Sequence, residues 1–248
     1  MAHAGVVKAL QEHGFQINAI SGVSSGAIVG ALLAKGLSPD EILEIAAGKL
    51  FSSWKPPFSL GILKKKRIEK MLSEHFPDNS FGSLRIPLTI SATNINTCQT
   101  DFFSEGELLK PLVASSAIPL LFSPVEINGY QYLDGGMINN FPVEPFAKDP
   151  LPVIGVHVNP PKTSEHISNT LKIVQRSLEL SAFKNVQWRK KECRLVIEPE
   201  NLVQYAVYDF EKSRDIFIAG YEAACAVLEK MKTDGDCFHP AVMNKSAA

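Results

Sequence analysis

The chain has 248 residues, of which 45% are hydrophobic and 21% are charged, and its formal net charge at pH 7 is −1. This composition is typical of a globular protein and excludes disordered, fibrous and membrane-spanning chains. The nearly balanced charge gives no overall field that would attract nucleic acid, so no nucleic-acid partner is expected.

The length suits one large core, and we expect a single domain over residues 1–248. The four cysteines have neither paired spacing nor a zinc-like spacing to histidine, so free thiols are expected. No signal peptide opens the sequence, and the longest apolar run, residues 27–34, is far shorter than the ~20 residues of a membrane-spanning helix. These features predict a cytoplasmic protein and leave its oligomeric state open.

Helical and extended patterns alternate along the chain, which predicts an α/β fold. In chain order we expect a helix over residues 3–13, a strand over 15–20, a buried helix over 26–34, a helix that starts at 38–41, strands over 86–94 and 97–103, a helix over 108–116, strands over 125–127, 130–132 and 153–158, a helix over 166–190, a strand over 194–197 and a helix over 211–232. The apolar strand over 153–158 suits the centre of a sheet.

Local signals support several of these elements. Ser38, Pro39 and the two acidic residues that follow them form a helix-start signal. Asn128-Gly129 is a strong hairpin signal between its two flanking strands. On the last helix, apolar residues recur at spacings of three and four, which indicates core packing rather than a ligand site.

The pattern Gly22-Val23-Ser24-Ser25-Gly26 fits G-x-S-x-G between a predicted strand and a predicted buried helix. This sharp strand-to-helix turn exposes a nucleophilic serine, and its glycines remove side chains that would crowd the turn. The start of the helix also offers unpaired N–H groups to a developing oxyanion. We expect Ser24 to be the nucleophile; the alternative is a serine that only caps the helix.

No histidine has a context that favours a catalytic base, because His157 lies on an apolar strand and the others lie near helix ends or in loops. An aspartate can replace histidine if it binds the serine hydroxyl directly in a partly dry site. Asp134 ends a strand-like stretch, and Gly135 and Gly136 let the backbone turn tightly past it. We expect Asp134 to be the base; the alternative is an ordinary Asp-Gly turn.

Four sequence blocks occur in a fixed order: HAGVVKAL at residues 3–10, ISGVSSGA at residues 20–27, ASSAIP at residues 114–119, and DGG at residues 134–136 with NNFPV at residues 139–143 behind it. Together these blocks resemble the bacterial patatin-like phospholipases. Weaker agreement continues into the last helix. The resemblance therefore spans most of the chain and is far more specific than G-x-S-x-G alone.

The resemblance implies a three-layer α/β/α fold with a mixed, mainly parallel central sheet, and hydrolysis of fatty-acyl ester bonds in phospholipids or related lipids. It maps a Ser–Asp dyad without histidine onto Ser24 and Asp134, working through an acyl-enzyme. No metal-ligand cluster or dinucleotide fingerprint appears in the sequence, and this mechanism needs neither metal nor cofactor. The alternatives are a catalytically weak or inactive lipid- or acyl-binding protein, and an acyltransferase.

The sequence departs from the family pattern at its start. The family normally has a strand and a glycine-rich loop of G-G-G-x-R-G type before the helix that here starts near His3, and the N–H groups of that loop form the oxyanion hole. Met1 stands where the loop would end, so we expect a domain without its first strand and this loop. Either a truncated chain or a catalytically weak homologue would explain this departure. Activity would suffer in both cases, since losing one oxyanion donor costs about 100- to 1,000-fold in rate.

Residues 51–67 suggest a membrane contact. Aromatic and aliphatic side chains over 51–63 run into the basic cluster at 64–67, a combination that suits peripheral contact with an anionic membrane surface. The alternative is a surface loop before a solvated helix start.

Two pairs of polar residues flank the predicted site in sequence. Ser115 and Ser116 indicate a helix end and a turn rather than a second nucleophile. Asn139 and Asn140 are expected to hydrogen-bond the loop backbone around Asp134.

Overall fold

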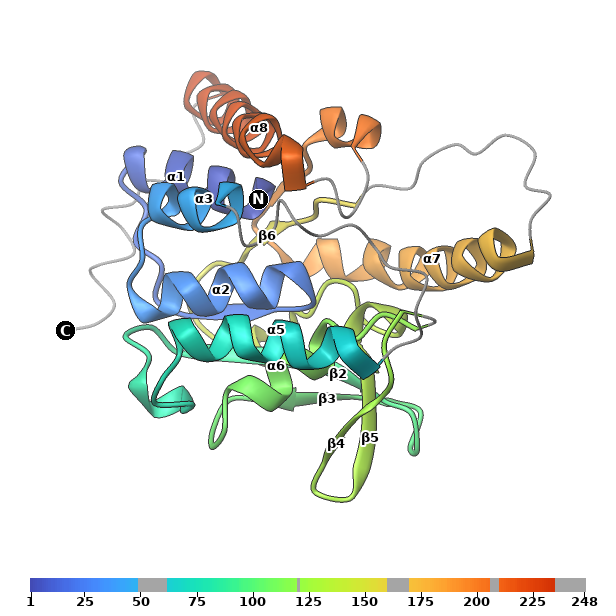
Figure 1. Ribbon diagram of the computed structural model, residues 1–248. Coiled ribbons are helices and arrows are strands. Elements are labelled where there is room, and N and C mark those ends of the chain that lie inside the picture. Colours follow the sequence, from blue (N-terminus) through green and yellow to red (C-terminus); the bar gives the residue numbers. More distant parts are fainter. Residues whose placement is uncertain (49–61, 120, 160–169, 206–209, 235–248) are drawn as a thin grey trace.

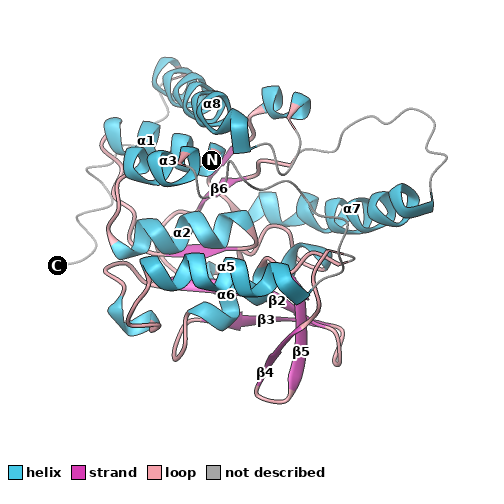
Figure 2. Cartoon of the chain, in the orientation of Figure 1, coloured by secondary structure: helices cyan, strands magenta, loops and turns pink. Residues whose placement is uncertain are grey.

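The described chain folds into two β-sheets covered by helices (Figure 1). The computed structural model describes residues 1–48, 62–119, 121–159, 170–205 and 210–234. The helices are α1 (Ala2–Glu12), α2 (Ser25–Lys35), α3 (Pro39–Ala47), α5 (Ile62–His75), α6 (Leu109–Ser115), α7 (Thr170–Arg189) and α8 (Ser213–Thr233). The strands are β1 (Ile20–Gly22), β2 (Leu88–Asn94), β3 (Gln99–Phe103), β4 (Val125–Ile127), β5 (Tyr130–Asp134), β6 (Ile154–Val156) and β7 (Leu195–Ile197). Figure 2 shows helices and strands together throughout the molecule, and the predicted α/β class is confirmed.

The larger sheet has the strand order β1-β2-β5-β4, and β3 pairs with β2 beside this path. β1 runs parallel to β2, whereas the pairs β2–β3, β2–β5 and β4–β5 are antiparallel. The expected mixed sheet is confirmed, but the expectation of a mainly parallel sheet is wrong for the described strands. The reason is that β2–β3 and β4–β5 are joined by short connections, which allow only antiparallel pairing.

The strand expected at a sheet centre lies instead in a separate two-stranded sheet. β6 pairs in parallel with β7, and this is its one pairing among the described strands. Its apolar residues are covered by α1 and α8 rather than by neighbouring strands on both sides, since Ile154 and Val156 pack against a buried cluster that includes residues of both helices, among them Leu10 and Leu228. Burial by helices explains the apolar sequence that suggested a central position.

The strand expected over residues 15–20 is displaced toward the C-terminus. β1 begins only at Ile20, whose N–H donates to the carbonyl of Pro87 at 2.9 Å. Phe15 is buried with Leu10 of α1 and Leu228 of α8. Because Phe15 is held by helix packing, the residues between it and Ile20 approach the sheet without pairing to it.

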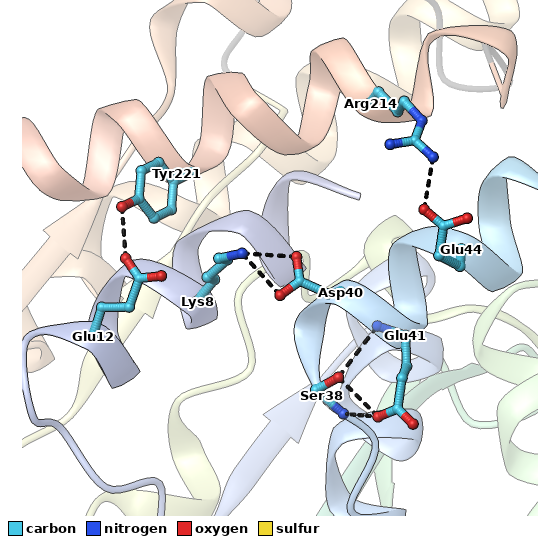
Figure 3. Close-up of polar contacts among 8 residues, drawn as sticks. All are labelled: Lys8, Glu12, Ser38, Asp40, Glu41, Glu44, Arg214 and Tyr221. Atoms are coloured by element: carbon cyan, nitrogen blue, oxygen red, sulfur yellow. Dashed lines mark hydrogen bonds and ion pairs between the residues drawn. The ribbon is translucent and has the colours of Figure 1, made fainter.

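The turn and cap signals in the sequence act as expected. Asn128 and Gly129 both have left-handed backbone, with φ of 51° and 80°, which is the geometry of a two-residue hairpin turn between β4 and β5. At the start of α3, the Ser38 hydroxyl accepts the Glu41 N–H and the Glu41 carboxylate accepts the Ser38 N–H, as drawn in Figure 3. This reciprocal capping box satisfies two of the free N–H groups at the helix start.

Helices α2 and α6 cover the larger sheet. Small and aliphatic side chains fill this core with almost no exposure to solvent: Ala27, Ala31 and Leu32 of α2, Leu112 and Val113 of α6, and Leu88, Ile90 and Ala92 of β2. The small residues let α2 lie close to β1 and β2. This packing fixes the position of the α2 N-terminus, which is where Ser24 lies.

A second core lies where α1 and α8 pack together. On α8 the predicted apolar stripe faces α1, and Phe217, Ala224 and Leu228 are buried as expected. Gly5 and Gly220 have no room for a side chain, because the backbone of the partner helix occupies that space. Figure 3 shows the polar contacts that link α1, α3 and α8 at their surface: Lys8 with Asp40, Arg214 with Glu44, and Tyr221 with Glu12.

Some expectations lie partly or wholly outside the described residues. Of the proposed membrane segment, residues 51–61 are not described, and residues 62–67 are described only as backbone of α5. None of the described helices is both long and apolar enough to cross a bilayer. Three of the cysteines are free thiols, as expected, and Cys237 is outside the described part of the chain.

Candidate active site

The two expected site residues lie at the ends of β1 and β5, which pair with successive parts of the same edge of β2, because β3 occupies the other edge. β1 runs parallel to β2 and ends with Gly22 opposite Ile90, so Ser24 lies two residues further in the same direction. β5 runs antiparallel to β2 and ends with Asp134 opposite Ala92. Because β1 runs parallel to β2 and β5 runs antiparallel to it, the ends of β1 and β5 point toward each other. This arrangement brings Ser24 and Asp134 together beside Ala92.

Ser24 and Asp134 are in direct contact. The Ser24 hydroxyl donates a hydrogen bond to Oδ2 of Asp134 at 2.7 Å, and Oδ1 of the same carboxylate accepts the Gly136 N–H at 2.8 Å. Asp134 is buried, and burial raises its pKa to about 6 because it disfavours the charged carboxylate, while both hydrogen bonds act in the opposite direction. A carboxylate of this kind can take up and release a proton near neutral pH.

The turn that presents Ser24 is strained. Ser24 has φ of 51° and ψ of −124°, a conformation that non-glycine residues rarely adopt. Gly22 precedes the turn, and a side chain there would lie 2.8 Å from the backbone of Gly26 and Ala27. Only glycine fits at this close approach, which explains the first glycine of the G-x-S-x-G pattern.

The start of α2 leaves one N–H group beside the nucleophile. The Gly26 N–H donates to the carbonyl of Val23 at 2.8 Å, so it is already engaged. For the N–H of Ser25, no acceptor lies within the part of the chain that the structure describes. Ser25 is the residue directly after Ser24, the position whose N–H commonly faces the oxyanion in serine hydrolases with this turn.

The end of α6 holds both site residues in place. The buried hydroxyl of Ser115 accepts the backbone N–H of Ser24 at 2.8 Å, and the carbonyl of Ala117 accepts the backbone N–H of Asp134 at 2.9 Å. The expectation that the helix ends at this point is confirmed, whereas the contact of Ser115 with Ser24 is not predicted by the sequence pattern. The block at residues 114–119 is the sequence signal that could have indicated a role for Ser115, because the end of a helix does not by itself require a serine at this position.

The loop after Asp134 packs tightly against the sheet. A side chain at Gly135 would lie 2.6 Å from the carbonyl oxygen of Ser91 and 2.8 Å from Cγ2 of Val23. The carbonyl of Asp134 accepts a hydrogen bond from the buried Thr93 hydroxyl at 2.9 Å. These contacts, together with the pairing of β5 to β2, fix the backbone position of Asp134.

Asn139 connects this loop to α7. Its N–H donates to the carbonyl of Gly135 at 2.9 Å, and its side-chain oxygen accepts the Phe141 N–H at 3.1 Å. Its Nδ2 donates to Glu144 at 2.9 Å, and Glu144 also accepts a bond from Nε of Arg189 at 2.7 Å. The expectation that Asn139 hydrogen-bonds the loop backbone is confirmed.

Neither His157 nor His3 hydrogen-bonds Ser24 or Asp134 within the described part of the chain. His157 is 3% exposed and its Nδ1 lies 2.8 Å from Glu198, so the expected core role is confirmed. The ring of His3 packs beside Gly26, with Nε2 3.4 Å from the place a side chain would occupy there. Burial lowers the pKa of His3 to about 3, so its imidazole is neutral at neutral pH. No group of three or more metal-ligating side chains occurs among the described residues.

The chain is similar in sequence to a known family and to several curated proteins. Residues 1–147 match the family model described as patatin-like phospholipase. An NTE family protein of Mycobacterium tuberculosis is 33% identical over 151 residues, covering 59% of this chain and 42% of the relative. Lysophospholipases NTE1 of Saccharomyces cerevisiae and Aspergillus terreus are 24% and 26% identical over 268 and 270 residues, covering 94% and 95% of this chain but 16% and 18% of the relatives.

The fold has a solved counterpart as well. The crystal structure of VipD from Legionella pneumophila superposes with a TM-score of 0.52 at 14% identity, covering 92% of this chain and 64% of VipD. This likeness supports the same α/β fold. The chain spans less than half the length of the curated relatives that it matches. Because the family match extends over residues 1–147, more than half of the chain and both segments of the site, this chain belongs to the patatin-like phospholipase family.

Proposed function

We propose that this protein hydrolyses fatty-acyl esters of lipids, with Ser24 as the nucleophile and Asp134 as the general base. The observation that carries the proposal is the 2.7 Å hydrogen bond from the serine hydroxyl to the aspartate carboxylate. Membership of the family supports a lipid substrate. The lysophospholipases among the relatives support a phospholipid or lysophospholipid as the substrate class.

In the first half of the reaction Ser24 Oγ attacks the acyl carbonyl carbon while its proton passes to Oδ2 of Asp134. The tetrahedral intermediate then collapses, the ester C–O bond breaks, and Asp134 returns the proton to the departing alcohol. The product of this half is an acyl-enzyme on Ser24 and a free alcohol, here a lysophospholipid or a glycerophospho-alcohol.

In the second half a water molecule takes the place of the alcohol. Asp134 removes a proton from the water as its oxygen attacks the acyl carbonyl, and the proton then goes to Ser24 Oγ when the acyl–oxygen bond breaks. A fatty acid leaves and the dyad is restored. One carboxylate is sufficient for both halves because its pKa of about 6 lies close to the pH at which it works.

The intermediate carries negative charge on the former carbonyl oxygen. We assign the Ser25 N–H as one donor to this oxyanion, because it lies next to the nucleophile at the positive end of α2 and has no acceptor among the described residues. The expected place of action is the cytoplasm, with peripheral contact to lipid surfaces. No metal or cofactor takes part in the proposed steps.

The proposal is tested with a fluorophosphonate probe, which labels activated serine nucleophiles. We expect labelling of the wild-type protein at Ser24, complete loss in Ser24→Ala, and unchanged labelling in Ser25→Ala, which removes the exposed neighbouring hydroxyl. Asp134→Asn should slow labelling by about 100- to 10,000-fold, the range for loss of a general base.

Product analysis completes this test. With a phosphatidylcholine or lysophosphatidylcholine substrate, the wild-type protein should release free fatty acid in equal amount to the alcohol product. Labelling that persists in Ser24→Ala would overturn the assignment of the nucleophile. Acyl transfer to an added alcohol at the expense of free fatty acid would overturn the assignment as a hydrolase.

A further inference from the structure

The loop that follows Asp134 is closed by Asn139. The backbone N–H of Asn139 donates to the carbonyl of Gly135 at 2.9 Å, which completes the turn Gly135–Met137. This turn presents the Gly136 N–H to Oδ1 of Asp134 at 2.8 Å. We call residues 135–144 the base loop. A change in its geometry reaches the carboxylate through the Gly136 N–H.

The side chain of Asn139 is fully buried and is bonded at both ends of its amide. Its Oδ1 accepts the Phe141 N–H at 3.1 Å, and its Nδ2 donates to Oε2 of Glu144 at 2.9 Å. An ionised carboxylate can only accept hydrogen bonds, so Glu144 determines which end of the amide faces it. Glu144 thereby holds Asn139 in one orientation.

Glu144 is held in turn by Arg189, the last residue of α7. Nε of Arg189 donates to Oε1 of Glu144 at 2.7 Å, which leaves Oε2 for the bond from Asn139. Arg189 is 8% exposed, and its helix is fixed against the base loop because Val186 and Phe141 belong to one buried apolar cluster. A buried guanidinium bonded to a carboxylate in this way is a strong and directional anchor.

We propose that the ion pair of Arg189 with Glu144 positions the carboxylate of Asp134 for its reaction. The inference rests on the proposed function, in which Asp134 is the general base. The pair acts through Asn139 and the turn that Asn139 closes, so both of its members are positioning residues. The alternative is an ion pair that only stabilises the fold.

The two roles differ in their effect on the pKa of Asp134. Burial raises this pKa to about 6, and the hydrogen bonds from Ser24 and Gly136 act in the opposite direction. If the ion pair positions the turn, its loss weakens the bond from the Gly136 N–H, and the pKa of Asp134 rises further. An ion pair that only stabilises the fold leaves this pKa unchanged in the molecules that remain folded.

The test measures kcat and KM for soluble p-nitrophenyl butyrate between pH 5 and pH 9. Glu144→Gln and Arg189→Met each remove one charge of the pair. Glu44→Gln is the matched control, because Glu44 also accepts a bond from an arginine at 2.7 Å, but this bond links α3 to α8. Circular dichroism melts set an assay temperature below the unfolding transition of every variant.

A double variant, Glu144→Gln with Arg189→Met, guards against loss of folding. It leaves no unpaired buried charge, whose cost could unfold a single variant. Its effect on the rate should resemble that of either single variant and not the product of the two, because both residues act through the same contact.

We expect kcat to fall about 10- to 100-fold in all three variants of the pair, with KM within about twofold of wild type. The midpoint of the pH profile of kcat/KM should rise by at least about half a pH unit, since a hydrogen bond to a charged group is weakened. Glu44→Gln should keep the wild-type rate and midpoint.

A wild-type midpoint in the folded variants would overturn the proposal even where kcat is lower, because a purely structural role explains such a loss. Ser24→Ala separates this inference from the proposed function. If Ser24→Ala is inactive while Glu144→Gln behaves like wild type, the proposed function stands and the positioning role is wrong. Wild-type hydrolysis by Ser24→Ala would instead overturn the proposed function, and the positioning role would fall with it.

Discussion

The backbone N–H of Ser24 donates a hydrogen bond to the hydroxyl of Ser115 at 2.8 Å, although 91 positions separate the two residues. Ser24 has left-handed backbone, a conformation that costs on the order of 1–3 kcal/mol and persists only where the surroundings hold it. Ser115 is fully buried at the end of α6, so its oxygen is a fixed acceptor. The relationship makes Ser115 a positioning residue for the nucleophile rather than a group that touches substrate.

Replacing Ser115 by alanine should therefore reduce turnover more than substrate binding. The variant leaves the Ser24 N–H without its acceptor and removes one restraint on the strained turn. We expect kcat to fall about 10- to 100-fold with KM within about twofold of wild type, since small displacements of a reacting group have effects of this size. Steady-state kinetics on a soluble ester separates the two constants.

Ser116→Ala is the matched control for that variant. The Ser116 hydroxyl is buried and has no hydrogen-bond partner in the described structure, so its removal should be neutral or slightly stabilising. Equal losses of kcat in the two variants would mean that the loop as a whole, and not the hydrogen bond to Ser24, determines the rate.

The rate should depend on pH through Asp134. Its pKa is raised to about 6, and only the ionised carboxylate can accept the proton of Ser24. We expect kcat/KM to be constant above pH 7 and to fall by about tenfold per pH unit well below pH 6. Initial rates between pH 4.5 and 8.5 measure this, with return to neutral pH showing that the protein stays folded. A midpoint near pH 4 would contradict the buried environment that raises this pKa.

The same pKa predicts how stability changes with pH. The folded-state pKa of about 6 exceeds the reference value of 3.8, so protonated Asp134 contributes stability that is complete below pH 4 and lost as pH rises through 6. Asp134→Asn resembles the protonated form at every pH. Its advantage in free energy of unfolding should grow from near zero at pH 4 to about 3 kcal/mol at pH 8.

Chemical denaturation of both proteins at several pH values checks this. Asp78→Asn, which makes the same change in charge at an exposed position, should show no comparable growth with pH. A constant difference between Asp134→Asn and wild type from pH 4 to pH 8 would mean that the carboxylate is already ionised at the lower limit.

Local sequence signals predicted those parts of the site that depend on local geometry. The turn at Ser24 follows from its glycines and the buried helix behind it, and the β4–β5 hairpin that leads to Asp134 follows from Asn128-Gly129. Both features are set by residues within a few positions of one another. The contact of Ser24 with Asp134 depends on β1 and β5 meeting along one edge of β2, an arrangement that local sequence patterns do not contain.

The parts that were missed depend on contacts between distant segments. Ser115 has the sequence context of a helix end, and its contact with Ser24 exists only because α6 packs on β2 beside α2. The late start of β1 has the same origin, since Phe15 is taken up by the α1–α8 core.

Gly135→Ala tests how closely the base loop must approach the sheet. Gly135 has no left-handed backbone, so an alanine is not excluded by conformation. Its Cβ would instead lie 2.6 Å from the Ser91 carbonyl oxygen and 2.8 Å from Cγ2 of Val23, and backbone in a central strand cannot move aside cheaply. We expect a loss of about 1–3 kcal/mol in free energy of unfolding.

The activity of this variant should fall further than its stability suggests, because relief of the clash displaces the residue that follows Asp134 and with it the 2.7 Å bond to Ser24. Gly82→Ala is the matched control, since a side chain there meets only the Ser80 hydroxyl at 3.5 Å, an ordinary contact. Thermal melts and fluorophosphonate labelling rates measure the two effects separately. If Gly135→Ala melts and labels like Gly82→Ala, the loop has freedom to shift, and the position of Asp134 must be set by β5 and the Ala117 carbonyl alone.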